Sequence, residues 1–287
     1  MVRPDHPLLA GLVDDAALFP PGNAPMAQAV LDHHERAFEP WAGAVGVFVC
    51  PAARVRELVS AMAPSQTVLV SLVVDPAVPG LYDAVRAADS AERVAVVGIE
   101  APLERLGPDG ARVLAEDLLG FGVETGPHTG YLEVPRASPD SALDMVRTTG
   151  WHSAKYRTGG VTADAHPDET ELAHFLVGCR ERGLDFKLTA GLHHAVRGTT
   201  PEGFEQHGVL NVLLAVAAAA RGADRREVAT VLAERDGRLL AKEARSWTRA
   251  EAAQVRQQFR SFGCCAVAEP LDELRTLGVL EDDEEGP

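Results

Sequence analysis

Short, apolar, valine-rich runs alternate with helical patterns along most of the 287-residue chain, and this alternation constrains the fold more than any other feature. Eight runs are predicted to be strands, at residues 12–19, 44–51, 67–75, 93–101, 130–135, 152–158, 185–189 and 263–269. Most are apolar on both faces, which is typical of strands buried between a core and covering helices. Helix signals lie between them, such as Pro25 at the start of a helical pattern and the Thr248/Glu251 capping box.

Eight β–α units in one chain predict an α/β fold of the (β/α)8 barrel, or TIM barrel, type. The doubly wound alternative usually has a glycine fingerprint after the first strand, and residues 19–25 read FPPGNAP instead. We expect one domain over residues 1–280. Residues 195–262 form a helical insertion between the last two strands, with helices near 203–221, 225–235 and 248–259. The insertion fits a lid, a contact in a homo-oligomer, or plain packing, and 281–287 reads as an acidic disordered tail.

The charge and the cysteine content exclude several classes of protein. The net charge of −15 disfavours binding to nucleic acid and to anionic membrane surfaces. The longest apolar run, at 212–220, is too short to span a bilayer, and no signal peptide is recognised at the start. Four cysteines without a CxxC pair favour a cytoplasmic protein, and without a cofactor motif we expect no cofactor.

Polar residues near the carboxyl ends of the strands are the candidate site, because active sites of such barrels lie at that end. Alternation puts Lys155 and Arg157 on the inward face of their strand, and Lys187 and Thr189 on that of the next. By the same reasoning the glutamates of two preceding strands point inward, at Glu100 and Glu133. At the first strand, Asp14 is favoured over Asp15 as the inward carboxylate.

Two inward lysines on neighbouring strands favour a specific chemistry. Each ammonium disfavours the charge of the other, so one lysine is expected to be neutral near neutral pH and to attack a carbonyl carbon. The product is a Schiff base, for which Glu133 or Glu100 would relay protons. The alternative is a structural ion-pair network of Lys155 with Glu133 and of Lys187 with Glu100, since buried charges are usually paired.

Glycines follow both lysine strands and favour a bound ligand. Gly159, Gly160 and Gly191 would let backbone amides approach an anion, although tight turns also explain them. Arg157 and Arg197 would hold a carboxylate or a phosphate. We therefore expect a small anionic substrate.

The segments AKYRTGG (154–160) and FKLTAG (186–191) resemble the paired lysine strands of class I aldolases of the deoxyribose-phosphate aldolase type. The resemblance implies that Lys155 forms the Schiff base and that Lys187 tunes its pKa. It covers two strands and the barrel plan. Arg157 has no counterpart, Glu100 stands where those enzymes carry aspartate, and GLHHAVR (191–197) replaces a plainer phosphate-binding turn. As a whole, the chain also resembles an uncharacterised bacterial barrel family, from which no residue role is carried over.

Histidines, cysteines and one further glutamate complete the candidates. His193 and His194 follow the seventh strand and would bind or polarise substrate, as would Glu269 at the end of the predicted eighth strand. Cys264 and Cys265, expected at the start of that strand, are interpreted as packing residues. No spacing typical of zinc ligands occurs.

The sequence thus predicts an enzyme, a lyase of aldolase type or a related carbonyl isomerase. Lys155, Lys187, Glu133 and Glu100 would be its catalytic residues. A metal-assisted hydrolase or lyase using His193 or His194 is one alternative. A non-catalytic binding or assembly barrel is the other.

Overall fold

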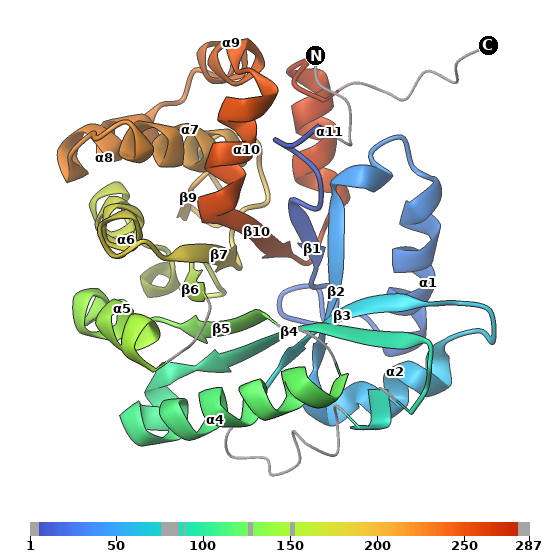
Figure 1. Ribbon diagram of the computed structural model, residues 1–287. Helices are drawn as coiled ribbons and strands as arrows, with labels where there is room; N and C mark the ends of the chain where they lie inside the picture. The colour runs from blue at the N-terminus through green and yellow to red at the C-terminus, as the bar shows by residue number, and fades with distance from the viewer. Residues whose placement is uncertain (1–5, 76–85, 89, 126–128, 150–152, 281–287) are drawn as a thin grey trace.

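The computed structural model describes residues 6–75, 86–88, 90–125, 129–149 and 153–280. Within them, eight parallel strands close into a barrel in the order β1-β10-β7-β6-β5-β4-β3-β2 (Figure 1). The strands are β1 Val13–Asp15, β2 Val45–Pro51, β3 Val68–Val73, β4 Val94–Pro102, β5 Thr129–Glu133, β6 Ser153–Arg157, β7 Asp185–Thr189 and β10 Phe259–Cys264. A separate two-stranded hairpin joins β8 Gly198–Thr199 to β9 Glu205–Gln206. The predicted (β/α)8 barrel is confirmed.

Helices surround the barrel on its outer side (Figure 1). They are α1 Met26–Glu35, α2 Val55–Ala61, α4 Leu103–Thr125, α5 Pro139–Thr148, α6 Glu169–Arg182, α7 Val209–Ala220, α8 Arg225–Ala233, α9 Gly237–Ser246, α10 Arg249–Gln258 and α11 Ala268–Thr276. Short 3-10 turns cover Arg36–Phe38, Ala42–Ala44, Ala52–Arg54 and Ala163–Ala165. The long helix α4 is kinked at Gly107, whose φ of 63° is not helical. None of the described helices combines the length and the apolar character that a bilayer crossing needs.

Helix α10 illustrates how local sequence sets these boundaries. The Thr248 hydroxyl accepts from the Glu251 amide, and the Glu251 carboxylate accepts from the Thr248 amide, so the predicted capping box is confirmed. The helix ends at Gln258, and the next residue already belongs to β10. Because no loop separates them, the end of α10 fixes where the last barrel strand begins.

The predicted position of the eighth strand, 263–269, is wrong. The strand is β10, Phe259–Cys264, and the apolar run beyond it turns into helix α11. A register shift between Phe259 and Ser261 interrupts the pairing of β10 with β7, and it disguises the two-residue alternation in the sequence. Glu269 therefore lies in the first turn of α11 and not in a strand.

The insertion between β7 and β10 is present, with one helix more than expected. It contains the hairpin β8–β9 and the helices α7, α8, α9 and α10, of which α9 was not predicted. Helix α7 is buried along almost its whole length, and α8 packs on both α6 and α7. The helices thus extend the outer layer, and the acidic tail at 281–287 lies outside the described residues.

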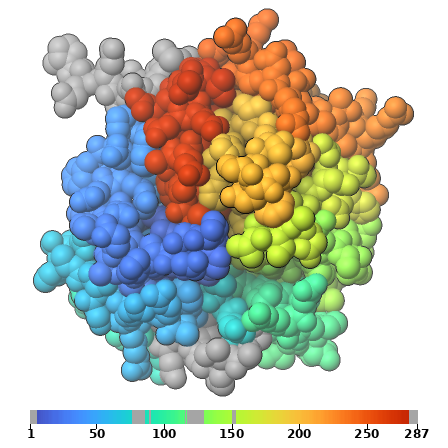
Figure 2. All heavy atoms as spheres, turned by 180° about the vertical axis from the view of Figure 1, so that it is seen from behind, coloured from blue at the N-terminus to red at the C-terminus, as the bar shows by residue number. Residues whose placement is uncertain are grey.

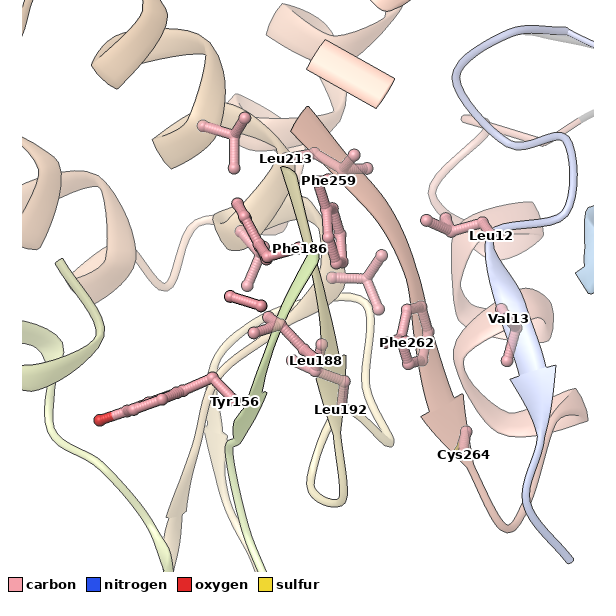
Figure 3. Close-up of a cluster of buried hydrophobic side chains, with 14 of the residues drawn as sticks. Leu12, Val13, Tyr156, Phe186, Leu188, Leu192, Leu213, Phe259, Phe262 and Cys264 are labelled. Carbon is pink, nitrogen blue, oxygen red and sulfur yellow. The ribbon is translucent and has the colours of Figure 1, made fainter. Parts of the chain in front are cut away.

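The main apolar core lies between the strands and the outer helices. Outward-facing aromatic rings of β6, β7 and β10 pack in a row, with Phe186 stacked on Phe259 at 5.4 Å between centroids. Phe175 of α6 contacts this row through Tyr156, at 4.4 Å, and through Phe186, at 5.3 Å. Figure 3 shows Phe186, Phe259 and Leu213 of α7 gathered between β7, β10 and the helices. This apolar layer fixes the position of β6, β7 and β10, the same strands that carry inward polar residues.

Candidate active site

A row of charged side chains crosses three adjacent strands of the barrel. Glu133 of β5 pairs in register with Lys155 of β6, and Lys155 pairs in register with Lys187 of β7. In-register neighbours in a sheet point to the same face. The barrel therefore brings together the two lysines and the glutamate that the sequence predicted to be inward.

Ion pairs join these groups into one buried cluster. Lys155 Nζ lies 2.9 Å from Glu100 Oε2 and 3.0 Å from Glu133 Oε2. Lys187 Nζ lies 2.6 Å from Glu100 Oε1 and 2.7 Å from Asp14 Oδ2. Glu100 thus shares its two oxygens between the two lysines. The Lys155–Glu133 and Lys187–Glu100 pairs of the structural alternative are both present.

Neutral donors complete the shell around the carboxylates. Ser71 donates to Glu100 Oε1 at 2.7 Å, and Ser261 donates to Asp14 Oδ2 at 2.7 Å. The backbone amide of Val47 donates to Asp14 Oδ1 at 3.1 Å. A Cβ on Gly46 would lie 2.2 Å from that oxygen, so the glycine makes room for the Asp14 carboxylate. Sequence reasoning missed both serines, and Ser261 was hidden by the misplaced eighth strand.

The other carboxylate of β1 points out of the barrel. Asp15 Oδ2 lies 2.9 Å from His33 Nδ1 and pairs with Arg36, both in the outer layer that follows β1. Asp14 is therefore the inward residue of the two, as alternation favoured.

The protonation of the lysines differs from the sequence-based expectation. Burial lowers the pKa of Lys155, but Glu100 and Glu133 outweigh it, so the net shift is upward. Burial also lowers the pKa of Lys187, but Asp14 and Glu100 outweigh burial and hold the pKa of this lysine well above its ordinary value. These upward shifts contradict the expectation of a lysine that is neutral near neutral pH. Lys187 does lower the pKa of Lys155, but less than the carboxylates raise it.

The carboxylates shift in the opposite direction. Burial raises the pKa of Glu100, but the two ammonium groups outweigh it and hold the net value far below the usual range. The pKa of Glu133 is also lowered, because Lys155 and Arg157 offset its burial. These directions favour the charged forms of Lys155, Lys187, Glu100 and Glu133 at neutral pH.

A cavity of about 690 Å³ opens above this cluster at the carboxyl end of the strands. Lys155, Lys187, Glu100 and Glu133 line its floor, and Arg105 and Arg157 line its rim. Its walls come from the segments that follow the strands. Figure 2, seen from behind, shows the blue segment before α1, the gold segment around the β8–β9 hairpin and red α11 meeting on one face. A small polar molecule fits this volume.

Two arginines on this side of the barrel differ in what they can reach. Arg157 is half-exposed and lies 3.4 Å, through Nε, from Glu133 Oε1. Arg197, by contrast, is buried and pairs with Glu169 at 2.7 Å and Glu205 at 3.2 Å. The prediction that Arg197 joins Arg157 in holding an anion is not supported by this geometry.

The glycines after β6 and β7 pack against each other. A Cβ on Gly159 would lie 2.7 Å from the Gly191 Cα, and one on Gly191 would lie 2.6 Å from the Thr158 carbonyl oxygen. Gly191 also has a φ of +104°. Gly160, Gly191 and Thr189 line the cavity, whereas Gly159 does not. Close approach of the two loops therefore explains Gly159 without a ligand.

The two histidines after β7 face different surroundings. His193 lines the cavity, and its Nδ1 lies 2.9 Å from Glu269 Oε2. His194 Nδ1 lies 2.7 Å from Glu273 Oε1 of α11, and His194 is not among the residues lining the cavity. The structure thus brings His193 to the site and turns His194 to the helix. Glu269 does not line the cavity itself, but it contacts His193, which does.

One acceptor in the cavity has no partner within the described residues. Gln206 of β9 lines the cavity, and its Oε1 is buried without a hydrogen bond. Sequence reasoning missed it because it lies in the insertion, far along the chain from any barrel strand. In the same described part of the chain, no group of three His, Cys, Asp or Glu side chains is arranged to hold a metal ion.

A closed barrel of eight parallel strands with helices outside it is the architecture of (β/α)8 barrel proteins, whose active sites lie at the carboxyl end of the strands. Among solved structures, a "putative deoxyribose-phosphate aldolase" from Toxoplasma gondii ME49 is similar, with a TM-score of 0.50 and 17% sequence identity over 94% of each chain. At this identity the likeness shows the fold alone. No family model matches the chain, and no curated protein matches it.

Proposed function

We propose that this chain is a lyase of aldolase type, in which Lys155 forms a Schiff base with a small carbonyl substrate. One observation carries the proposal: Lys155 Nζ borders the cavity with two carboxylates, of Glu100 and Glu133, within 3.0 Å. A lysine that must lose a proton and attack a carbonyl carbon needs an acceptor at this distance. The barrel fold that the chain shares with an aldolase-like structure agrees with this reaction class but does not establish it.

Lys155 is favoured over Lys187 as the nucleophile because of what surrounds each amine. Lys187 is 1% exposed and lies between the buried carboxylates of Asp14 and Glu100, which two serines hold in place. Lys155 also pairs with Glu100, but its second partner is Glu133, whose side chain is 21% exposed and lines the cavity. A proton taken by Glu133 can therefore leave through the cavity. Lys187 also borders the cavity, but the two carboxylates that could take its proton are almost completely buried.

The first step is a proton transfer followed by addition. Glu133 takes a proton from the Lys155 ammonium, and the free amine forms a C–N bond while the carbonyl electrons move to oxygen. That oxygen takes one proton back from Glu133 and a second from the nitrogen, and leaves as water, which gives the iminium. Glu133 then takes the proton of the hydroxyl on the β carbon, whose O–H electron pair forms the carbonyl of the released fragment. The bond between the α and β carbons breaks, and its electron pair passes to the iminium to give an enamine. Lys187 stays charged and keeps Glu100 oriented.

The polar groups around the cavity suggest the substrate class. The cluster on the floor has no excess positive charge, so an anionic group would be held at the rim by Arg157 and Arg105. Both arginines already have a carboxylate partner, but the Arg105–Asp75 pair at 3.0 Å is closer than the Arg157–Glu133 pair at 3.4 Å, so Arg157 is the stronger candidate. The unpaired Oε1 of Gln206 suits a hydroxyl donor. We therefore propose a small hydroxylated aldehyde or ketone bearing one anionic group.

Borohydride trapping tests this function. The wild-type protein, treated with sodium borohydride and a panel of small hydroxyaldehydes and hydroxyketones, is expected to carry a reduced adduct on the peptide that contains Lys155. Because the pKa of Lys155 is raised, the unprotonated fraction is small at neutral pH. The trapping rate should rise up to about tenfold per pH unit between about pH 7 and pH 10. A rate that falls over this range would contradict the assignment of Lys155.

The matched variants are Lys155→Arg, which retains the positive charge, and Lys187→Arg. We expect Lys155→Arg to abolish both the adduct and C–C cleavage, and Lys187→Arg to reduce cleavage while leaving an adduct on Lys155. Substrate cleavage by Lys155→Arg at the wild-type rate would sink the proposal.

The second candidate is a non-catalytic barrel, which is favoured by the ion pairs that each lysine forms with two carboxylates. It predicts that small anions bind, as measured by calorimetry, with no adduct and no turnover at any pH in that range. Binding that is lost in Arg157→Ala, with trapping absent throughout, would favour this candidate.

A further inference from the structure

A second group of reactive side chains lies on another wall of the same cavity. Cys265, just beyond β10, places its Sγ 3.8 Å from His193 Nε2, and His193 Nδ1 lies 2.9 Å from Glu269 Oε2. Both Cys265 and His193 line the cavity. This is a thiol, an imidazole and a carboxylate in sequence, the arrangement that activates a nucleophile through an oriented base.

The carboxylate decides which nitrogen of the imidazole can act as the base. Glu269 is acidic and accepts the hydrogen of Nδ1, so in the neutral ring the lone pair is on Nε2. Nε2 is the nitrogen that faces Cys265. Cys264 instead lies 3.8 Å from Nδ1, the nitrogen already engaged with Glu269. The geometry therefore selects Cys265 over its neighbour.

The remaining cysteines provide an internal contrast. Cys50 and Cys179 are buried, and burial raises the pKa of the Cys50 thiol to about 12 and that of Cys179 well above its ordinary value. Hydrogen bonds to Cys264, Cys265 and Glu269 raise the pKa of His193 to about 11, which favours an imidazolium beside sulfur. Of the four cysteines, Cys265 alone combines partial exposure with a contact to His193 Nε2.

We propose that Cys265, activated by His193 and oriented by Glu269, is a second nucleophile of the cavity that binds small aldehydes as a reversible thiohemiacetal. His193 Nε2 takes the thiol proton, and the sulfur forms a bond to the aldehyde carbon. The carbonyl electron pair moves to oxygen, which takes the proton back from His193. Atoms and charges balance without any oxidant or further reactant. The inference goes beyond the proposed function, since it does not need Lys155 to react.

Alkylation by iodoacetamide of the full-length native protein, followed by peptide mass spectrometry, tests the activation. Cys265 is expected to react at least about tenfold faster than Cys264, with Cys50 and Cys179 unmodified. His193→Gln should slow Cys265 by about tenfold or more. Glu269→Gln, at a half-exposed position that tolerates substitution, should slow it less. A Cys265 rate that is equal to that of Cys264, or unchanged in both variants, would overturn the activation.

Protection by an aldehyde tests the binding. Propanal is expected to slow the alkylation of Cys265 in a saturable manner, and its removal by dialysis should restore the rate. Cys264→Ser is the matched control and should retain the protection. Absence of protection at concentrations that trap Lys155 would overturn the thiohemiacetal.

The same measurement in Lys155→Arg separates the two nucleophiles. Protection that persists in this variant supports a bond to Cys265 itself. Protection that disappears would mean that propanal on Lys155 merely shields the thiol, so the inference would fail while the proposed function stood. Protection of Cys265 without any borohydride adduct on Lys155 would support the thiohemiacetal and contradict the proposed Schiff base.

Discussion

The two faces of strands β6 and β7 are both buried, but they are stabilised in different ways. On the outer face, Tyr156 and Phe186 pack into a layer of aromatic and aliphatic side chains (Figure 3). On the inner face, Lys155 and Lys187 are equally buried and are held by carboxylates. The outer face gains stability with each apolar contact, whereas the inner face is stable only while its charges stay matched. Substitutions on the two faces should therefore differ in size and in pH dependence.

The largest effect is expected for Lys187→Met. This change leaves Asp14 without its ammonium partner and removes one of two partners from Glu100. Breaking a buried pair from one side should lower the free energy of unfolding by about 3–5 kcal/mol. Urea denaturation at neutral pH, with the exposed Lys242→Met as control, measures the difference.

The pH dependence of this deficit identifies its cause. A buried carboxylate that has lost its partner has a higher pKa in the folded protein than in the unfolded chain. Its ionised form therefore destabilises the folded variant at high pH, and this loss of stability is relieved as the pH falls and the carboxylate takes up a proton. The deficit of Lys187→Met relative to the wild type should narrow between about pH 7 and pH 5. A deficit that is constant over this interval would point to lost packing instead of unpaired charge.

A smaller effect is expected on the outer face, for Phe186→Leu. The substitution removes ring contacts with Phe175 and Phe259 and leaves a small cavity. It should cost about 1–2 kcal/mol in the free energy of unfolding. Because no charge is involved, the same loss is expected at about pH 7 and pH 5. A pH-dependent loss would show that the two faces are coupled.

The smallest effect is expected for Ser261→Ala. The serine donates to Asp14 Oδ2, an oxygen that also binds Lys187 and so keeps one partner. Loss of this hydrogen bond should cost about 1 kcal/mol. Ser246→Ala, at an exposed helical position, is the control and should change stability by less than half as much. A loss as large as that of Lys187→Met would mean that the serine, and not the lysine, fixes Asp14.

The sequence predicted the barrel well because buried parallel strands and capped helices leave strong local signals. The seventh strand, Asp185–Thr189, matches its prediction residue for residue, and alternation correctly turned Lys155 and Lys187 inward. The eighth strand was misplaced because a register shift breaks the alternation within Phe259–Cys264, while the residues beyond it are apolar enough to resemble a strand. Periodicity within one segment does not reveal such an irregularity.

The protonation of the cluster could not be predicted in the same way. Alternation indicated that two lysines would lie near each other, and their repulsion suggested a neutral amine. Whether repulsion or pairing dominates depends on how many carboxylates reach the same point, from strands far apart in the chain. Asp14 and Glu100 approach Lys187 from β1 and β4. Alternation turned both carboxylates inward, but it did not show that both reach the same amine. Gln206 and the Cys265–His193 contact likewise depend on segments that meet only in the folded barrel.

The carboxylate of Glu100, shared between two amines, has a consequence for the timing of the proposed reaction. A protonated Schiff base carries the same single positive charge as the ammonium that it replaces, so the anions around Lys155 would stabilise both. The uncharged amine between these two states is the one species that the surroundings disfavour. The highest free energy along the proposed reaction would thus be expected while Lys155 is an uncharged amine, after it loses the proton and before the C–N bond forms. Once the iminium exists, the cluster would regain the charge balance it has at rest, with Lys187 and Glu100 undisturbed.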